Sequence, residues 1–309
     1  MSEERFVVPP ELDGQRLDKA AAKLADGLSV ARLKRAIEEG HVRVDGRRRA
    51  KGATVAAGET ISIAREEVPQ PDAPAIAEPD APLVVRFEGK GVIIVDKPAG
   101  QPTTPLKGGE RGTLVNALVG HFPELAGVGY GPREPGVLHR IDTNTSGLII
   151  VARTQPAFEI LRAALLAGEI RKKYLLVCAS DGLADEGTIA HPIANHPKDT
   201  RRVLACVHPR DVMRYRPRQA NTNYKVLQRG TTHALVEVEV EFALRHQIRV
   251  HFASIGHPLV GDELYGSTEK MDPPRHALHA SFVGFNGKDD VSGFGVESPL
   301  PPEIGALIQ

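Results

Sequence analysis

A proline-rich segment over residues 66–82 divides this chain. Its sequence, EEVPQPDAPAIAEPDAP, contains five prolines and no pattern from which a hydrophobic core could form. Such a segment favours extended polyproline geometry and acts as a semi-rigid spacer. The sequence therefore predicts a small domain over residues 1–65, a linker over 66–82 and a larger domain over 83–309.

Membrane and metal classes are disfavoured by what the chain contains. Its longest apolar runs are far shorter than the ~20 residues that span a bilayer, and residues 1–16 show no signal-peptide pattern. The two cysteines, Cys178 and Cys206, cannot build a metal cage alone, and no histidine pair has a zinc-binding spacing. We expect a cytoplasmic protein with no membrane partner, no metal and no cofactor.

The small domain shows two helical patterns and two short strand patterns. Apolar residues recur at helical spacing from Leu17, and Ser29 is a typical N-cap for a second helix that ends at Gly40. Alternating strand patterns occupy 41–44 and 60–63, and Asp45-Gly46 is a hairpin turn signal. The pattern predicts a small α/β fold.

Positive charge is concentrated in this domain. Residues 15–65 contain twelve Lys/Arg and six Asp/Glu, a net charge of +6, although the whole chain is neutral with 39 of each. A basic surface of this kind suits nucleic-acid phosphates, and the alternative is an ordinary solvated face. The residues expected to contact RNA are Arg32, Lys34, Arg35, Arg47, Arg48 and Arg49.

The small domain resembles the RNA-binding domain first described in ribosomal small-subunit protein four. The resemblance is carried by Arg16-Leu17-Asp18, by the helix start at Ser29, and by the segments 40–46 and 58–61. It implies RNA as the partner of this domain.

The larger domain alternates strand and helix patterns. A hairpin is predicted over 83–87 and 92–96, and further strands over 173–179 and 234–242. Helices are predicted over 113–122, 156–168 and 246–255. These elements predict a mixed α/β or α+β domain.

The most informative segment is 137–151, in which a polar loop directly precedes a buried apolar strand. Asp142 is thereby held at a strand edge, and Gly147 allows close backbone approach. Taken alone, the loop also fits an Asx turn in which Asp142 caps its own backbone. A kinase catalytic loop is disfavoured because neither a glycine-rich loop nor a metal-binding Asn accompanies it.

Residues 139–147, HRIDTNTSG, closely resemble the signature H-R-L-D-x-x-T-S-G of the RluA family of pseudouridine synthases, with Ile141 in place of Leu. Further segments resemble the family in order and spacing. They are VDKPAG at 95–100, RKKY at 171–174, HQIRVH at 246–251, GHPLVGD at 256–262 and ALHA at 277–280.

This resemblance implies an α+β fold, with a mixed-sheet catalytic domain behind a small α/β RNA-binding domain. It implies isomerisation of uridine within RNA, with Asp142 as the catalytic carboxylate and Tyr174 against the flipped base. Arg140, beside Asp142, is expected to be an RNA-phosphate contact or a structural residue rather than a catalyst. Large-subunit ribosomal RNA is the expected substrate, with transfer RNA as a possible second target, and a monomer is expected.

One position departs from the family. Leu244 stands where an arginine that pairs with the catalytic aspartate is expected, so Arg245 is the first candidate partner of Asp142. Arg249, one helical turn further, is the alternative. A chain without this ion pair would be a catalytically weak RNA-binding or ribosome-assembly factor that retains the synthase fold, which is the alternative function.

Overall fold

The computed structural model describes residues 3–50, 52–68, 74–241 and 243–308. The chain forms two compact units, Met1–Ala73 and Pro74–Gln309, which are described separately below.

The expected spacer over 66–82 differs from the structure at both of its ends. Val68 is buried in the core of the first unit. On the other side, the Ala75 amide donates to Pro132 O at 2.9 Å and the Glu78 amide donates to Asn116 O at 3.0 Å. The unit boundary therefore lies between residues 73 and 74 instead of at 65 and 83, and residues 69–73 lie outside the described residues.

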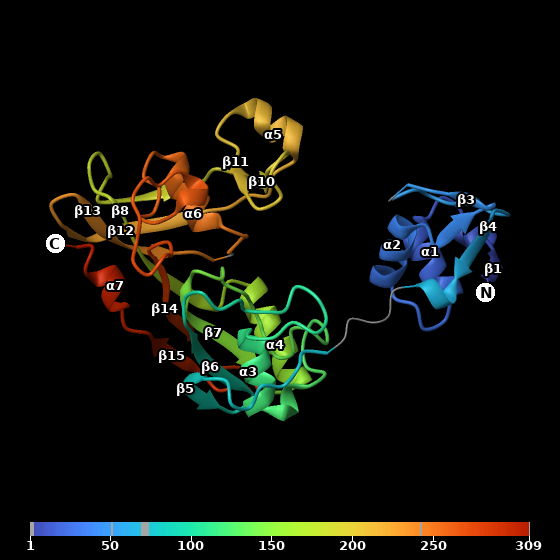
Figure 1. Ribbon diagram of the computed structural model, residues 1–309, viewed down its shortest axis with the longest axis horizontal. Coiled ribbons are helices and arrows are strands. Elements are labelled where there is room, and N and C mark those ends of the chain that lie inside the picture. The colour runs from blue at the N-terminus through green and yellow to red at the C-terminus, as the bar shows by residue number, and fades with distance from the viewer. Residues whose placement is uncertain (1–2, 51, 69–73, 242, 309) are drawn as a thin grey trace. The chain divides into compact units, whose positions relative to one another are not determined.

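The first unit packs two helices against a small antiparallel sheet, coloured blue in Figure 1. The order of its described strands is β1-β4-β2-β3. The elements are β1 (Glu3–Val7), α1 (Leu17–Leu24), α2 (Val30–Glu39), β2 (Val42–Val44), β3 (Arg47–Arg48) and β4 (Thr60–Ala64), with short 3-10 helices at Pro10–Leu12 and Arg65–Glu67.

Local signals fix the ends of these elements as the sequence predicts. The Ser29 side chain accepts a hydrogen bond from the Arg32 amide at 3.3 Å and caps α2, and Gly40 ends that helix with φ of 89°. Asp45 and Gly46 have φ of 48° and 74°, as the two-residue turn between β2 and β3 requires. Core residues come from both helices and the sheet, among them Leu17, Leu33, Val42, Ile61 and Ile63.

The second unit is built on one mixed sheet, whose described strands follow the order β5-β6-β7-β14-β8-β13-β12-β9, with β15 paired to β14. Strands β7 and β14 are parallel and the other pairs are antiparallel, which confirms the predicted α+β class. The sheet strands are β5 (Val84–Gly89), β6 (Val92–Lys97), β7 (Ser146–Ala152), β8 (Arg171–Ala179), β9 (Glu186–Ile189), β12 (Thr222–Arg229), β13 (His233–Glu239), β14 (Leu278–Phe285) and β15 (Phe294–Glu297). The predicted strand over 234–242 thus ends earlier, and residue 242 lies outside the described residues.

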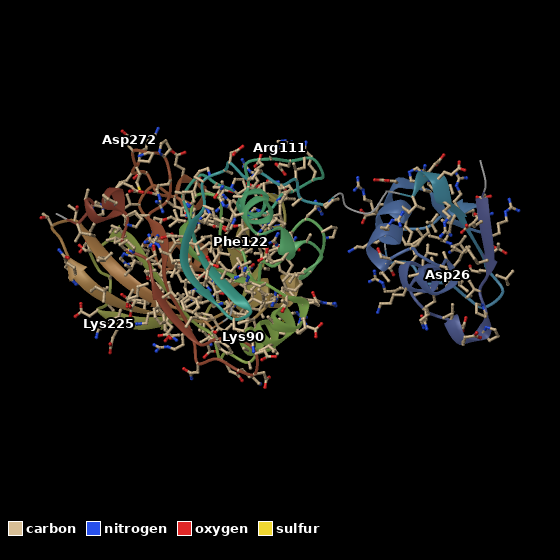
Figure 2. The ribbon with its side chains drawn as sticks, turned by 90° about the horizontal axis from the view of Figure 1, so that it is seen from below. Asp26, Lys90, Arg111, Phe122, Lys225 and Asp272 are labelled. Carbon is tan, nitrogen blue, oxygen red and sulfur yellow. The ribbon has the colours of Figure 1, made fainter. Side chains whose placement is uncertain are left out.

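Helices cover both faces of β6 and β7. Side chains alternate across a strand, so Ile93 and Val95 pack with α3 (Leu114–His121), whereas Val92 and Ile94 pack with α4 (Gln155–Leu166). Phe122, labelled in Figure 2, follows α3 and packs against the first of these clusters. Burial on two faces explains the continuous apolar runs of both strands.

The other half of the sheet carries α6 (Gln247–Ser254), whose Phe252 packs on the cluster formed by β8 and β13. The two-stranded sheet of β10 (Ile193–Asn195) and β11 (Val203–Ala205) packs against Val250 of α6, and α5 (Pro209–Tyr215) follows β11, in yellow in Figure 1. The remaining short elements are α7 (Pro302–Gly305) and the 3-10 helices at Pro123–Leu125 and Glu263–Tyr265. Within the described ranges, no helix has the length and apolar character needed to cross a membrane.

Candidate active site

The loop before β7, which carries Asp142, is held in place by a buried lysine. Lys97, at the end of β6, is fully buried, and its ammonium donates to the backbone oxygens of Pro98, Gln101 and Thr143 at 2.7–3.0 Å. Burial, with the nearby charge of Arg275, lowers the pKa of Lys97 to about 7. The Thr103 hydroxyl also donates to Ile141 O at 2.9 Å. The backbone on both sides of Asp142 is therefore fixed.

The residues after Asp142 connect the same loop to β14 and to the residues just before that strand. The Thr145 hydroxyl lies 2.7 Å from His276 Nε2, and the Ser146 hydroxyl lies 2.8 Å from His279 Nδ1. At Gly147, with φ of 115°, a Cβ would overlap the backbone of Ala280. Gly147 is therefore needed where β7 and β14 meet, as the sequence predicts.

Asp142 is paired with Arg249 of α6. A guanidinium nitrogen (Nη1) of Arg249 lies 2.6 Å from Asp142 Oδ2, while Nε and Nη2 form a two-bond pair with Asp262 at 2.7 and 2.8 Å. Arg249 is 6% exposed and Asp262 is 2% exposed. Burial opposes the charge of Arg249, but the hydrogen bonds and charges of Asp262 and Asp142 outweigh it and raise the pKa of Arg249. The arginine thus presents a fixed positive charge to Asp142.

Arg245, the first candidate partner of Asp142, is directed elsewhere. Its guanidinium donates to the backbone oxygens of Thr200 and Arg202 at 3.0 and 2.7 Å. The reason is local: His246 has left-handed φ of 53°, so α6 begins at Gln247 and Arg245 is not on the helix. The ion pair predicted for Arg245 is wrong, and the alternative, Arg249, is the partner. Leu244, the observation that favoured a catalytically weak binding factor, therefore does not remove the pair.

His246 is a site residue that the sequence did not indicate. Its Nε2 lies 3.7 Å from Asp142 Oδ1, and its Nδ1 lies 2.9 Å from the Tyr265 hydroxyl. Burial lowers the pKa of His246, against the opposing effect of Asp142. The ring of Tyr265 also lies 5.1 Å from the guanidinium carbon of Arg249. Both residues therefore support the pair of Asp142 and Arg249.

Tyr174 of β8 lies with Asp142 in the wall of a narrow slot, which is also lined by Ile141, Leu244 and Ile248. Tyr174 is 5% exposed. Burial, and then the charge of Asp142, raise the pKa of its phenol, which therefore remains protonated at neutral pH. The structure brings Tyr174 and Asp142 to one place although 32 positions separate them.

The slot opens into a cleft with a volume of about 1130 Å³, which is rich in positive charge. Arg140, exposed on the Asp142 loop, lines both the slot and the cleft. The cationic residues lining the cleft are Arg140, Lys172, Arg216, Arg218, Arg245 and Arg249, against Glu110 and Asp142. A cleft with this excess of cations suits a polyanion. Across the described ranges, no group of three or more His, Cys, Asp or Glu is placed to hold a metal ion.

The cations predicted for RNA contact in the first unit are on its surface. Lys34, Arg35, Arg47, Arg48 and Arg49 are exposed and Arg32 is half-buried. Arg35 and Arg49 are paired with Glu39 and Glu59 at 3.0 and 2.7 Å. A Cβ at Gly40 would overlap the Arg48 guanidinium, so Arg48 of β3 lies against the end of α2.

A cleft with an excess of cations around a carboxylate that a buried arginine holds in place suits an enzyme that acts on RNA. Comparisons with known proteins agree. Residues 91–254 match the family model described as RNA pseudouridylate synthase, and residues 15–61 match the S4 domain. The chain belongs to the RNA pseudouridylate synthase family, and is thus an isomerase that converts uridine to pseudouridine in RNA, with an S4 domain at residues 15–61.

Relatives align with nearly the whole of this chain. The chain is 37% identical over 313 residues to ribosomal large subunit pseudouridine synthase D of Nitrosomonas europaea, covering 98% of this chain and 86% of the relative. It is 34% identical to the protein of that name from Escherichia coli, with coverages of 96% and 90%, and 33% identical to an uncharacterized RNA pseudouridine synthase of Bacillus subtilis, with coverages of 97% and 95%. Human RNA pseudouridylate synthase domain containing 1 shares the fold, with a TM-score of 0.56 at 23% identity over 74% of this chain and 89% of that one.

Proposed function

We propose that this synthase isomerises uridines of large-subunit ribosomal RNA and that Asp142 is its catalytic carboxylate. The observation that carries the assignment is the Asp142–Arg249 pair, 2.6 Å apart at the slot beside Tyr174. The substrate is inferred from the relatives named ribosomal large subunit pseudouridine synthase D, which align with nearly the whole chain. A cytoplasmic location and a monomeric state fit such a substrate.

The reaction moves one glycosidic bond. The bond from N1 of uracil to C1′ of ribose breaks, the base turns, C5 bonds to C1′, C5 loses its proton and N1 gains one. The target uridine first leaves its stack, at a cost of a few kcal/mol. In the proposed reaction Asp142 attacks C1′ or stabilises positive charge there, as in glycoside chemistry.

The neighbours of Asp142 have separate roles. Arg249 is held by Asp262 from behind, so it orients Asp142 without needing to move during the reaction. Tyr174 contacts the flipped base, where an aromatic contact is worth ~1–3 kcal/mol. Burial keeps its phenol protonated, so Tyr174 can donate a hydrogen bond to the base.

RNA is held at two places. The cleft of the second unit surrounds the target, with Arg140 at its edge, and the S4 unit adds phosphate contacts through Arg32, Lys34, Arg35, Arg47, Arg48 and Arg49. Transfer RNA has the same phosphates and stays a possible second target.

The test is release of tritium from carbon five of uridine in unmodified large-subunit ribosomal RNA. Asp142→Asn is compared with Asp181→Asn, which changes an exposed carboxylate of the same unit. Wild type and Asp181→Asn are expected to release tritium, and Asp142→Asn is expected to release none while binding the RNA with unchanged affinity.

Equal release by Asp142→Asn would refute the catalytic assignment. Release from transfer RNA but not from large-subunit RNA would overturn the proposed substrate and leave the catalytic assignment standing.

A further inference from the structure

Among the described residues of the second unit, four cations are buried: Lys97, Lys172, Arg249 and Arg275. Three of them have hydrogen-bonding or ionic partners. Lys97 donates to three backbone oxygens, Arg249 contacts two carboxylates, and Arg275 contacts Glu303 at 2.8 Å. Lys172 of β8 is 3% exposed, and no side chain or backbone atom of the described residues forms a hydrogen bond or ion pair with its ammonium. Its neighbour Lys173, by contrast, is paired with Glu237 at 3.0 Å.

Lys172 faces the substrate side of the sheet. Alternation along β8 places its side chain on the same face as Tyr174, two residues on. Lys172 also lines the cleft, as His139 and Arg140 do, and it is close enough to His139 for its charge to affect that residue. Its ammonium is not among the fully enclosed unpaired polar atoms of the described chain, which are Gln101 Oε1 and Arg202 Nε. The ammonium is therefore not fully enclosed, but with Lys172 only 3% exposed it keeps little contact with the solvent of the cleft.

An unpaired ammonium in this position is unfavourable for the folded protein. Taking a charge out of water is compensated only when an opposite charge and hydrogen bonds replace the water. Burial lowers the pKa of Lys172 to about 8. Burial of His139, and then the charge of Lys172, lower the pKa of His139 to about 3. The surroundings of Lys172 thus lack an anion that the folded chain could have supplied.

The backbone phosphate is the anionic group of RNA that can pair with Lys172. Uracil and ribose are neutral, so the phosphate is the group of an RNA strand that pairs with an ammonium. Lys172 and Tyr174 are about 7 Å apart along the strand, so a phosphate at Lys172 lies near the base at Tyr174. This reasoning rests on the proposed function, because it takes RNA as the occupant of the cleft.

We propose that Lys172 is the binding residue for a backbone phosphate of the RNA beside the target uridine. The phosphate completes a buried ion pair that the free protein lacks, and it fixes the strand next to the slot that holds Asp142. The contact differs from those of the S4 unit because it is made inside the cleft and at one position of the strand.

The experiment compares Lys172→Met with Lys173→Met in the full-length chain. Methionine keeps much of the length and apolar stem of lysine and removes the charge. The two residues are adjacent on β8 but face opposite sides of the sheet, and Lys173 is paired with Glu237. Dissociation constants for an unmodified transcript of large-subunit ribosomal RNA are measured across a salt series, and the melting temperature of each protein is measured without RNA.

Lys172→Met is expected to weaken RNA binding about 10-fold and to reduce the slope of log affinity against log salt by about 0.7, the value for one single-strand phosphate contact. Its melting temperature is expected to equal or exceed that of wild type, since an unpaired buried charge is removed. Lys173→Met is expected to leave both the affinity and the slope unchanged.

Unchanged affinity and slope in Lys172→Met would overturn the proposal, as would a lowered melting temperature with unchanged binding, which would show a structural lysine. Equal loss by both variants would also overturn it. Binding is measured without turnover, so this result is independent of tritium release: a failure at Lys172 leaves the role of Asp142 intact, and a failure at Asp142 leaves the phosphate contact intact. Competition by inorganic phosphate as effective as that by RNA would assign the site to free phosphate and would likewise overturn the proposal.

Discussion

The two units use charge in opposite ways. In the first unit the predicted RNA-binding cations lie on the surface, and their ion pairs, such as Arg35–Glu39 and Arg49–Glu59, involve partly exposed side chains. Pairs of this kind contribute ~0–1 kcal/mol each and are screened by salt. In the second unit Arg249 is buried between Asp142 and Asp262. The surface charges can be removed one by one with small effects, whereas the buried set must be complete.

The contrast is tested most severely at Arg249. Arg249→Met leaves Asp262 buried without a partner and Asp142 without its cation. We expect a loss of ~3–5 kcal/mol in the free energy of unfolding of the second unit. In the folded fraction, we expect a fall of ~10²–10³ in the rate of tritium release.

Arg245→Met is the matched control, because Arg245 bonds only to the backbone oxygens of Thr200 and Arg202 in the described structure. We expect this variant to retain the tritium-release rate at saturating enzyme. Its free energy of unfolding is expected to fall by ~1 kcal/mol or less. Equal damage from the two substitutions would contradict the assignment of Arg249 as the partner of Asp142.

Lowering the pH is expected to destabilise the second unit more than the first. Burial lowers the pKa of His251 to about 4, of His139 to about 3 and of His276 to about 2. The unfolded chain, with histidine pKa near 6.5, therefore binds more protons than the folded chain below pH 6.5. Stability from these groups is full above pH 6.5 and falls by ~1.4 kcal/mol per pH unit for each histidine as the pH drops toward the folded value.

All three histidines belong to the second unit, so its amide exchange is expected to accelerate between pH 6.5 and 4.5 more than that of the first unit. Hydrogen exchange of the full chain, corrected for the intrinsic pH dependence, measures the two units in one sample. Parallel acceleration of both units would count against the neutral buried histidines as the cause.

The surface charges of the first unit should behave additively. Replacing Arg47, Arg48 and Arg49 by Gln is expected to reduce the slope of log RNA affinity against log salt by about 2, or ~0.7 for each phosphate that is no longer neutralised. Replacing Arg5, Lys19 and Lys23 of the same unit removes equal charge away from the proposed contact residues. A similar reduction in the second triple variant would show a diffuse field instead of a defined surface.

The smallest expected effect is the loss of stability when one helix cap is removed from either unit. Ser29 in the first unit and Thr154 in the second each accept a backbone amide at 3.3 Å. Removal of either cap by alanine is expected to cost ~1 kcal/mol. Because a unit of 73 residues unfolds with less enthalpy than one of 236, Ser29→Ala should lower its melting temperature by ~4–8 °C and Thr154→Ala by ~2–4 °C. Calorimetry of the full chain measures both, and equal shifts would mean that the two units unfold together.

Local signals predicted local structure well. The cap at Ser29, the turn at Asp45-Gly46 and the close approach at Gly147 are each set by one or two residues, and the structure has them in place. The alternation of strand and helix patterns left the α/β and α+β classes open, and the family resemblance was needed to choose α+β. What failed was the step from Leu244 to Arg245, because the left-handed His246 that starts α6 at Gln247 has no signal in helical spacing.

The sequence could not predict which distant residues contact Asp142 and Arg249, and the reason is physical. Lys97 and Asp262 become site residues only when strands and loops distant in sequence come together around Asp142 and Arg249. The apolar Val68 and the backbone bonds of Ala75 likewise draw the ends of the proline-rich segment into the two units. Prolines predicted an extended backbone there, but they do not predict what that backbone contacts.

The central claim is that the first unit contributes affinity and the second contributes the chemical step. Single-turnover tritium release at increasing enzyme concentration separates the two quantities. For the Arg47, Arg48 and Arg49 triple variant we predict a higher half-saturating concentration with an unchanged limiting rate, and for Asp142→Asn unchanged RNA affinity with no release. A limiting rate that falls with the triple variant, or turnover that survives in Asp142→Asn, would contradict the account.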